Sequence, residues 1–337
     1  MDWIPMLFSP RASNYIIPHF YLNVKEKIIM KFKMAYLITD GYQMLENVMA
    51  LYELHPFPIY THSQDMAIYL GSQGIDAIYY DELTKIDKTI AIISASESKF
   101  GKQESDYFKN IVFIGHGISE KDYYLREDSD QLNDQKPKVD PNLIFARFIK
   151  NQENKEKPII SGSILYAPTI DPLCSFRNPK FTIINDITEL AKTRKVIIKP
   201  HAIHYHEEKY HELFTIENAI ILPERKYDIL SYMKDTDIFI GDVSTVSTMY
   251  TYFQRPFILL ETQVIKKDYS DQRLLRNSGA CEVVNSGSIL PLIDHLKYYE
   301  NNYFETWFGL KEKLSNVEAV FDSIIAIIAA NYITNKS

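Results

Sequence analysis

Residues 34–60 read MAYLITDGYQMLENVMALYELHPFPIY, and this stretch decides the fold class. A β-rich run at 35–39 comes first, and a second short one follows at 58–60. Between them, apolar side chains recur at helical spacing: Leu45, Val48, Met49 and Tyr52. Strand, helix and strand in this order are typical of a βαβ unit, whose two strands lie parallel. The stretch therefore predicts an α/β fold.

The rest of the chain repeats this alternation in two series. The first series adds β-rich runs at 77–80, 89–93 and 111–114. The second series has runs at 163–166, 195–199, 219–222, 237–240, 256–260 and 282–284. Stretches with helical spacing separate these runs, one of them at 204–214. We expect two Rossmann-like, doubly wound parallel-sheet domains whose strand ends face one cleft.

A polar tract divides the two series. It reads REDSDQLNDQKPKVD at 126–140, where the apolar period disappears, as is typical of a linker. We expect the closing helices to pack back against the first domain. The expected divisions are an unassigned extension at 1–33, an N-terminal domain at 34–140, a linker and helix at 141–162 and a C-terminal domain at 163–337.

Composition and charge exclude several classes of protein. The 337 residues are 46% hydrophobic and 24% charged, which is typical of a globular chain and not of a disordered one. The 37 basic and 44 acidic side chains leave a net charge of −7, which argues against a nucleic-acid partner. The apolar run 323–330 is too short to span a membrane, so we expect a buried terminal helix there.

Cysteine usage bears on metal binding and on the compartment. Cys174 and Cys281 lie far apart with no CxxC spacing, which argues against a zinc site and against an oxidising compartment. We therefore expect a cytoplasmic protein, and a peripheral contact with the inner face of the cell membrane stays open.

Chemically distinctive residues follow four of the predicted strands. They are His116, Thr169, Lys199 to His201, and Asp242 to Thr245. In open α/β sheets, ligands bind at the carboxyl ends of the strands. The sequence therefore predicts a binding site at this edge, with Thr169 and Lys199 lining it.

The segment DVSTVST at 242–248 lies between a predicted strand and a predicted helix. The start of a helix offers free N–H groups and a partial positive charge, which suit a phosphate. Ser244 or Thr245 could serve only as a helix cap. Because four hydroxyls in five positions exceed what one cap uses, we predict phosphate binding by Asp242, Ser244 and Thr245.

His116 lies between Gly115 and Gly117 in a GHG tripeptide. Flanking glycines let a substrate approach closely and expose the imidazole. A neutral imidazole can take a proton from an acceptor hydroxyl, so His116 is a candidate general base. A structural histidine in a tight turn is the alternative.

Lys199 and His201 in IIKPH supply two candidate cations at a strand end, which suit a diphosphate that loses a leaving group. A solvated face is the alternative. The nearby His204, His206 and His211 lack the spacing of a metal site, and HExxH is absent. We expect no metal.

Four segments, taken in order, resemble the CDP-glycerol glycerophosphotransferase family, the teichoic-acid primases and polymerases. They are GHG at 115–117, ILYAPT at 164–169, IIKPH at 197–201 and DIFIGDVSTV at 237–246. The resemblance implies the two-domain GT-B fold. It implies transfer of a polyol phosphate from a CDP-activated donor to a hydroxyl of a growing polymer, with release of CMP. We expect no cofactor.

The resemblance also implies residue roles. The histidine that matches His116 is the base in that family, and the histidine that matches His201 and the serines that match Ser244 and Thr245 hold the donor phosphates. The implied partners are a CDP donor and a polyol or glycan hydroxyl, which can be lipid-linked. Ile170, Ile118-Ser119 and Met249 depart from the family pattern, and they leave the donor polyol and the acceptor open.

Three alternatives remain from the sequence. A GT-B glycosyltransferase would use a nucleotide-sugar donor. A nucleotide-sugar 2-epimerase shares the fold, but those enzymes have a sequence similar to D-S-G-G at this turn. This chain has Asp242 to Thr245 there, without glycines, which disfavours an epimerase. A non-catalytic scaffold of a surface-polymer complex is disfavoured by the presence of both His116 and His201. On the nucleoside side, Glu224 and Arg225 follow a predicted strand and are candidates for ribose or base contacts.

Overall fold

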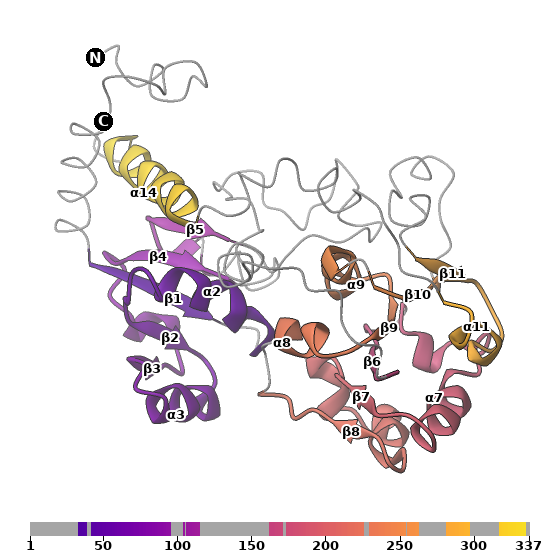
Figure 1. Ribbon diagram of the computed structural model, residues 1–337. Helices are drawn as coiled ribbons and strands as arrows, with labels where there is room; N and C mark the ends of the chain where they lie inside the picture. The colour runs from indigo at the N-terminus through magenta and orange to yellow at the C-terminus, as the bar shows by residue number, and fades with distance from the viewer. Residues whose placement is uncertain are drawn as a thin grey trace, which may run out of the picture.

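A computed structural model of the chain describes residues 33–38, 42–95, 104, 106–114, 162–170, 173–225, 229–253, 255–262, 281–296 and 317–334 (Figure 1). The extension up to residue 32, the GHG tripeptide and the polar tract 126–140 lie outside the described residues.

The first sheet has five parallel strands in the order β3-β2-β1-β4-β5. Its strands are β1 (Met34–Ile38), β2 (Ile59–Thr61), β3 (Ala77–Tyr79), β4 (Ala91–Ser94) and β5 (Ile111–Phe113). Its helices are η2 (Tyr42–Met44), α2 (Leu45–Tyr52), α3 (Gln64–Ser72) and η3 (Leu83–Lys85). All five residues of β1 are buried, as expected of a central strand covered on both faces. Ser63 caps α3 by accepting a hydrogen bond from the Met66 N–H at 3.2 Å.

The second sheet has six parallel strands in the order β11-β10-β9-β6-β7-β8. Its strands are β6 (Ile164–Ala167), β7 (Val196–Ile198), β8 (Ile220–Ile221), β9 (Ile238–Asp242), β10 (Phe257–Leu260) and β11 (Glu282–Val284). Its α-helices are α7 (Ile183–Ala191), α8 (Ile229–Lys234), α9 (Thr245–Tyr250) and α11 (Leu290–Ile293). Its 3₁₀ helices are η4 (Ser175–Arg177), η5 (Ala202–Tyr205), η6 (Glu208–Thr215) and η7 (Thr251–Phe253).

The predicted fold class, α/β with two doubly wound parallel sheets, is confirmed. In each sheet the chain starts at a central strand, builds outward, and then returns to the other side of that strand. The strand order therefore reverses between β1 and β4 in the first sheet and between β6 and β9 in the second. Such a reversal opens a crevice at the carboxyl ends of the two strands.

One predicted helix differs in kind. The stretch 204–214 forms parts of two 3₁₀ helices, η5 and η6, which are separated by His206 and by Glu207 in an extended conformation. The apolar residues Tyr210, Leu213 and Ile216 are buried and recur every third position. This spacing matches the three residues per turn of a 3₁₀ helix, so that one side of η6 faces the core.

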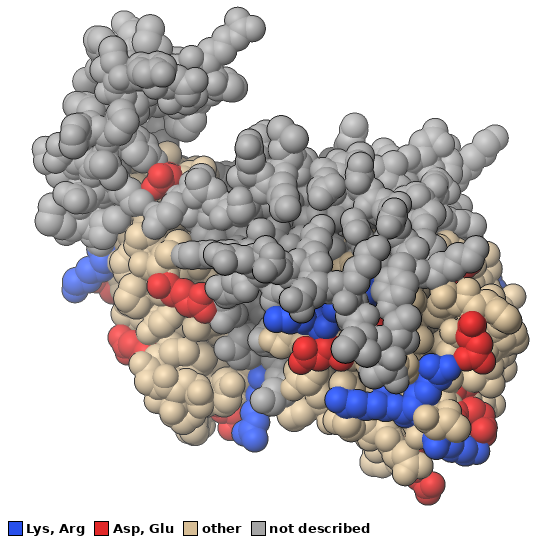
Figure 2. All heavy atoms as spheres, in the orientation of Figure 1, with Lys and Arg blue, Asp and Glu red and all other residues tan. Residues whose placement is uncertain are grey.

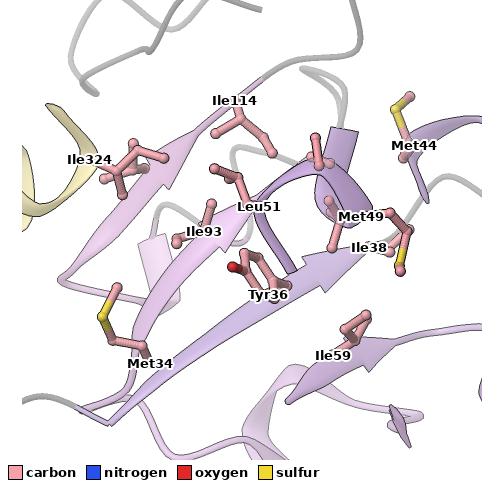
Figure 3. Packing of buried hydrophobic residues seen from close by; sticks show 14 of the residues in the cluster. Met34, Tyr36, Ile38, Met44, Met49, Leu51, Ile59, Ile93, Ile114 and Ile324 are labelled. Carbon is pink, nitrogen blue, oxygen red and sulfur yellow. The ribbon is translucent and has the colours of Figure 1, made fainter. Parts of the chain in front are cut away.

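The last helix, α14 (Val317–Thr334), packs against the first sheet although the second sheet precedes it in the chain. Figure 3 shows Ile324 of α14 on the same side of the sheet as Ile93 and Ile114, which share its buried cluster. The Phe321 ring stacks on His55 with centroids 3.6 Å apart. Among the described residues, no helix combines the length and apolar character needed to cross a membrane.

Charged side chains of both signs are interspersed on the described part of the face seen in Figure 2. Two ion pairs of the described residues lie at or near the end of α7. Lys192 and Glu189 are 2.6 Å apart on α7, and Arg194 and Asp294 are 2.6 Å apart near its end. Exposed pairs of this kind add little stability.

Gly241 in β9, in the second sheet, has no room for a side chain. A Cβ atom there would contact Phe239 Cε1, and would lie 2.7 Å from Phe239 Cζ and 2.8 Å from Ser247 Oγ. Phe239 is fully buried and stacked on Tyr250. We expect Gly241→Ala to lower the free energy of unfolding by about 1 to 3 kcal/mol, measured by urea denaturation.

The matched control is Gly71→Ala in α3, where a Cβ meets no atom within 4 Å. Alanine in an exposed helix should keep or raise stability by about 0.5 to 1 kcal/mol. Equal stability of the two variants would show that Phe239 can move aside.

Candidate functional site

The reversal point of the second sheet is organised by one carboxylate. Asp242 ends β9, and its Oδ2 accepts hydrogen bonds from the Thr169 N–H at 2.8 Å and the Ser175 N–H at 3.1 Å. Both donors belong to the segment that follows β6. Asp242 is fully buried, so it joins the carboxyl ends of the two strands between which the sheet order reverses.

Tyr166 lies beneath this junction. Its hydroxyl is 2.9 Å from Ser175 Oγ. Burial, followed by the Asp242 carboxylate, raises the pKa of Tyr166 well above its usual value, so that the phenol stays neutral.

The hydroxyls of the DVSTVST segment shape the start of α9. Ser244 Oγ accepts a hydrogen bond from the Ser247 N–H at 3.3 Å, which is an N-cap interaction. Ser247 Oγ donates to the Asp242 carbonyl. Ser244 is buried, and the side chain of Thr245 lies outside the described set. Two of the four hydroxyls therefore build the turn itself.

His201 begins η5, three residues after β7 ends. Its Nδ1 accepts a hydrogen bond from the Ile203 N–H at 3.4 Å, and its backbone N–H donates to His204 Nδ1 at 3.2 Å. An imidazole whose Nδ1 accepts is neutral and carries its proton on Nε2. In this contact Nδ1 is the acceptor, which fits a neutral ring that can donate from Nε2.

Lys199 follows β7 directly and is half-buried. Its Nζ donates to the Pro200 carbonyl at 3.3 Å and lies 5.8 Å from the centre of the Tyr205 ring. Its backbone N–H donates to the Tyr166 carbonyl at 2.9 Å. These contacts give Lys199 a place in the turn between β7 and η5.

The loop with Glu224 and Arg225 follows β8, at the same edge of the sheet. Glu224 Oε1 is 3.1 Å from His206 Nε2, and Arg225 is exposed. Tyr205, beside them, donates its hydroxyl proton to the Leu222 carbonyl. Burial, followed by the Glu224 carboxylate, raises the pKa of Tyr205.

This loop also acts on a residue of the first sheet. Partial burial raises the pKa of Tyr42, the carboxylates of Asp65 and Glu224 raise it further, and the Arg225 guanidinium lowers it. Tyr42 belongs to η2, at the carboxyl edge of the first sheet. Loops from the carboxyl edges of both sheets are therefore close enough to interact electrostatically.

Gly115, His116 and Gly117 lie outside the described residues, which end at Ile114, directly before them. Ile114 follows β5, and its N–H donates to the Ser94 carbonyl at the end of β4 at 2.9 Å. The hydroxyl of Ser94 donates to Glu104 Oε2 at 2.9 Å, and both side chains are buried. A buried carboxylate therefore lies near the ends of β4 and β5.

Sequence reasoning missed several residues of these two edges. Glu104, Ser94, Cys174 and Ser175 have no motif around them, and their contacts are with residues 10, 30 and 67 positions away in the chain. His204 was considered only as a metal ligand. It is buried, whereas His206 and His211 are exposed, and among the described residues no group of three metal-binding side chains comes together.

No protein-family model matches the sequence, and a search of curated proteins finds no match. Among solved structures, the chain is similar to a variant of the wall teichoic acid polymerase TagF soaked with CDPG. The identity is 13%, 93% of this chain and 88% of that chain are covered, and the TM-score is 0.41.

Two further similar structures contain a uridine nucleotide. MnaA of S. aureus with UDP has 12% identity, 88% and 91% coverage of this chain and that one, and a TM-score of 0.48. UDP-GlcNAc 2-epimerase of Neisseria meningitidis has 11% identity, 89% and 100% coverage and a TM-score of 0.42. At such identities and TM-scores these similarities carry no argument about activity, donor or acceptor.

Proposed function

We propose that this protein is a GT-B-type transferase that moves a polyol phosphate from a CDP-activated donor to a hydroxyl of a surface-glycan or teichoic-acid-like acceptor. One observation carries the proposal. The Asp242 carboxylate gathers the segments after β6 and β9 where the sheet order reverses, next to the Ser244 turn, and His201 follows β7, the strand beside β6. This is the part of a doubly wound sheet at which nucleotides bind.

The proposed reaction is displacement at phosphorus. The acceptor oxygen attacks the phosphorus that carries the polyol, and the bond from that phosphorus to the bridging oxygen breaks. CMP leaves with the electron pair of that bond, and the acceptor proton passes to a base. An N–H donor at the leaving phosphate stabilises the charge that develops there.

We propose His116 as the base and His201 as the donor to the leaving phosphate. The backbone N–H groups of the turn at Ser244 and Thr245 would hold the other phosphate oxygens, while Asp242 would position the turn and not touch the anion. Thr169, Gly115 and Gly117 would line the cleft. Glu224 and Arg225 would lie on the nucleoside side.

Residues 34–140 would then supply the acceptor side, and residues 163–337 the donor side. The buried Glu104 carboxylate, which accepts a hydrogen bond from Ser94, fits an acceptor side whose base comes after the next strand, β5. The acceptor can be a soluble glycan or a lipid-linked one at the inner face of the membrane.

A panel of donors tests the function. The purified protein is incubated with CDP-glycerol, CDP-ribitol and UDP-sugars, each with and without a polyol or glycan acceptor, and the free nucleotide is measured. Release of CMP is expected. Release of UDP would indicate a glycosyltransferase, conversion of a UDP-sugar without release would indicate a 2-epimerase, and no turnover would favour a scaffold.

Asp242 and Asp237 provide a matched pair of variants for the donor edge. Asp237 Oδ2 accepts hydrogen bonds from the N–H and the hydroxyl of Ser163, both at 3.0 Å, at the amino ends of β9 and β6. Asp242 holds the carboxyl ends of the same strands. Both carboxylates are buried, so Asp242→Asn and Asp237→Asn should each cost about 1 to 3 kcal/mol of stability.

Only Asp242→Asn should also weaken CMP binding, by roughly tenfold, because only its loop reaches the donor edge. Calorimetric titration of both variants with CMP measures the difference. Equal affinities in the two variants would remove Asp242 from the donor site.

A further inference from the structure

We propose that His204 is a positioning residue, which fixes His201 as a neutral hydrogen-bond donor with its proton on Nε2. The inference rests on the proposed function, because the atom that His204 positions is the one that would meet the donor phosphate. It concerns the second domain only, where both histidines, their partners and their distances are described.

The two histidines form a reciprocal cap at the start of η5. The His201 backbone N–H donates to His204 Nδ1 at 3.2 Å, while the Ile203 N–H donates to His201 Nδ1 at 3.4 Å. Each Nδ1 thus acts as an acceptor. In a neutral imidazole the remaining proton is then on Nε2, so both rings hold the same tautomer.

His204 is held from several sides. It is 1% exposed, and its ring packs on Tyr210 with centroids 4.2 Å apart. Its Nε2 lies 4.0 Å from Cys174 Sγ, in line with an N–H directed at sulfur. Cys174 directly precedes Ser175, whose N–H donates to Asp242. His204 therefore connects the loop held by Asp242 to the turn that carries His201.

The consequence is a defined proton on His201. Loss of the His204 acceptor leaves the His201 N–H without this partner and frees the turn to rotate. The His201 ring could then exchange between its two tautomers, and Nε2 would present a lone pair instead of a proton to an anion for part of the time. A phosphate would be held less tightly as a result.

Two substitutions of His204 distinguish the effect of its hydrogen-bond acceptor from the effect of its ring packing. His204→Asn keeps an acceptor at the position of Nδ1, because Asn Oδ1 is bonded to Cγ as Nδ1 is. His204→Phe keeps a ring to pack on Tyr210 but removes the acceptor. Imidazole ¹⁵N–¹H spectra, recorded on the full chain at about pH 8 where histidines are neutral, report the tautomer of His201.

The expected result is a proton on His201 Nε2 in the wild type and in His204→Asn, and a mixture of tautomers in His204→Phe. The Kd for CMP should rise roughly tenfold in His204→Phe and stay within about threefold in His204→Asn. A proton on His201 Nδ1 in the wild type would overturn the inference even if no variant folds.

An unchanged tautomer in His204→Phe would overturn it as well, as would a shifted tautomer with unchanged CMP affinity. If the wild type binds neither CMP nor CDP-glycerol, the proposed function fails. The spectra still decide in that case whether His204 sets the His201 tautomer.

Discussion

His116→Ala is expected to lower kcat by about 10² or more while the affinity for the CDP donor stays nearly intact. The reason is that base catalysis acts only in the transition state, when the acceptor hydroxyl loses its proton. The donor phosphates would bind the second domain, whereas residue 116 belongs to the first. Steady-state rates of CMP release, together with calorimetric binding of CMP, measure the two effects separately.

His62→Ala is the control for this variant. His62 is exposed and follows β2 at the carboxyl edge of the same sheet, with its Nδ1 3.1 Å from the Tyr80 carbonyl oxygen. It should leave kcat unchanged. If His116→Ala unfolded the protein, or raised only the donor KM, the histidine between two glycines would belong to a structural turn, and the base would lie elsewhere.

His201→Ala is expected to weaken donor binding and turnover together. It removes the Nε2–H that would donate to the leaving phosphate, a loss of roughly 1 to 3 kcal/mol, or about 5- to 150-fold in Kd for CMP. It also removes the Nδ1 that accepts from Ile203, so the start of η5 loosens. The affinity for CMP, measured by calorimetric titration, and the rate of CMP release should therefore decrease in parallel.

His211→Ala in the neighbouring η6 is the matched control, because His211 is exposed. It should keep both binding and turnover. A His201→Ala variant that bound CMP as the wild type does, and lost only kcat, would move His201 from the donor phosphate to the chemical step.

The strands of both sheets could be predicted from the sequence for a physical reason. A parallel strand covered on both faces is a continuous apolar run, and β1, β4 and β9 are buried along their whole length. The strand ends follow from the same pattern. Polar residues such as Asp242 and Lys199 begin where the apolar run stops, so the edge that would carry the site was visible as well.

The roles at that edge were less predictable, because they depend on contacts between distant segments. Asp242 reads as a phosphate ligand in DVSTVST, yet its carboxylate holds Thr169 and Ser175, 73 and 67 positions away. Ser244 turned out to cap α9. The 3₁₀ form of 208–215 was hidden because Tyr210 and Leu213 suit a 3.6-residue period nearly as well.

The measurement that tests the central claim most directly is nucleotide release by the purified wild-type protein given CDP-glycerol or CDP-ribitol and a polyol or glycan acceptor. The account predicts that CMP is released, that the polyol phosphate appears on the acceptor, and that His116→Ala abolishes nearly all of both. Release of UDP from a UDP-sugar, with no CMP from either CDP-polyol, would contradict it.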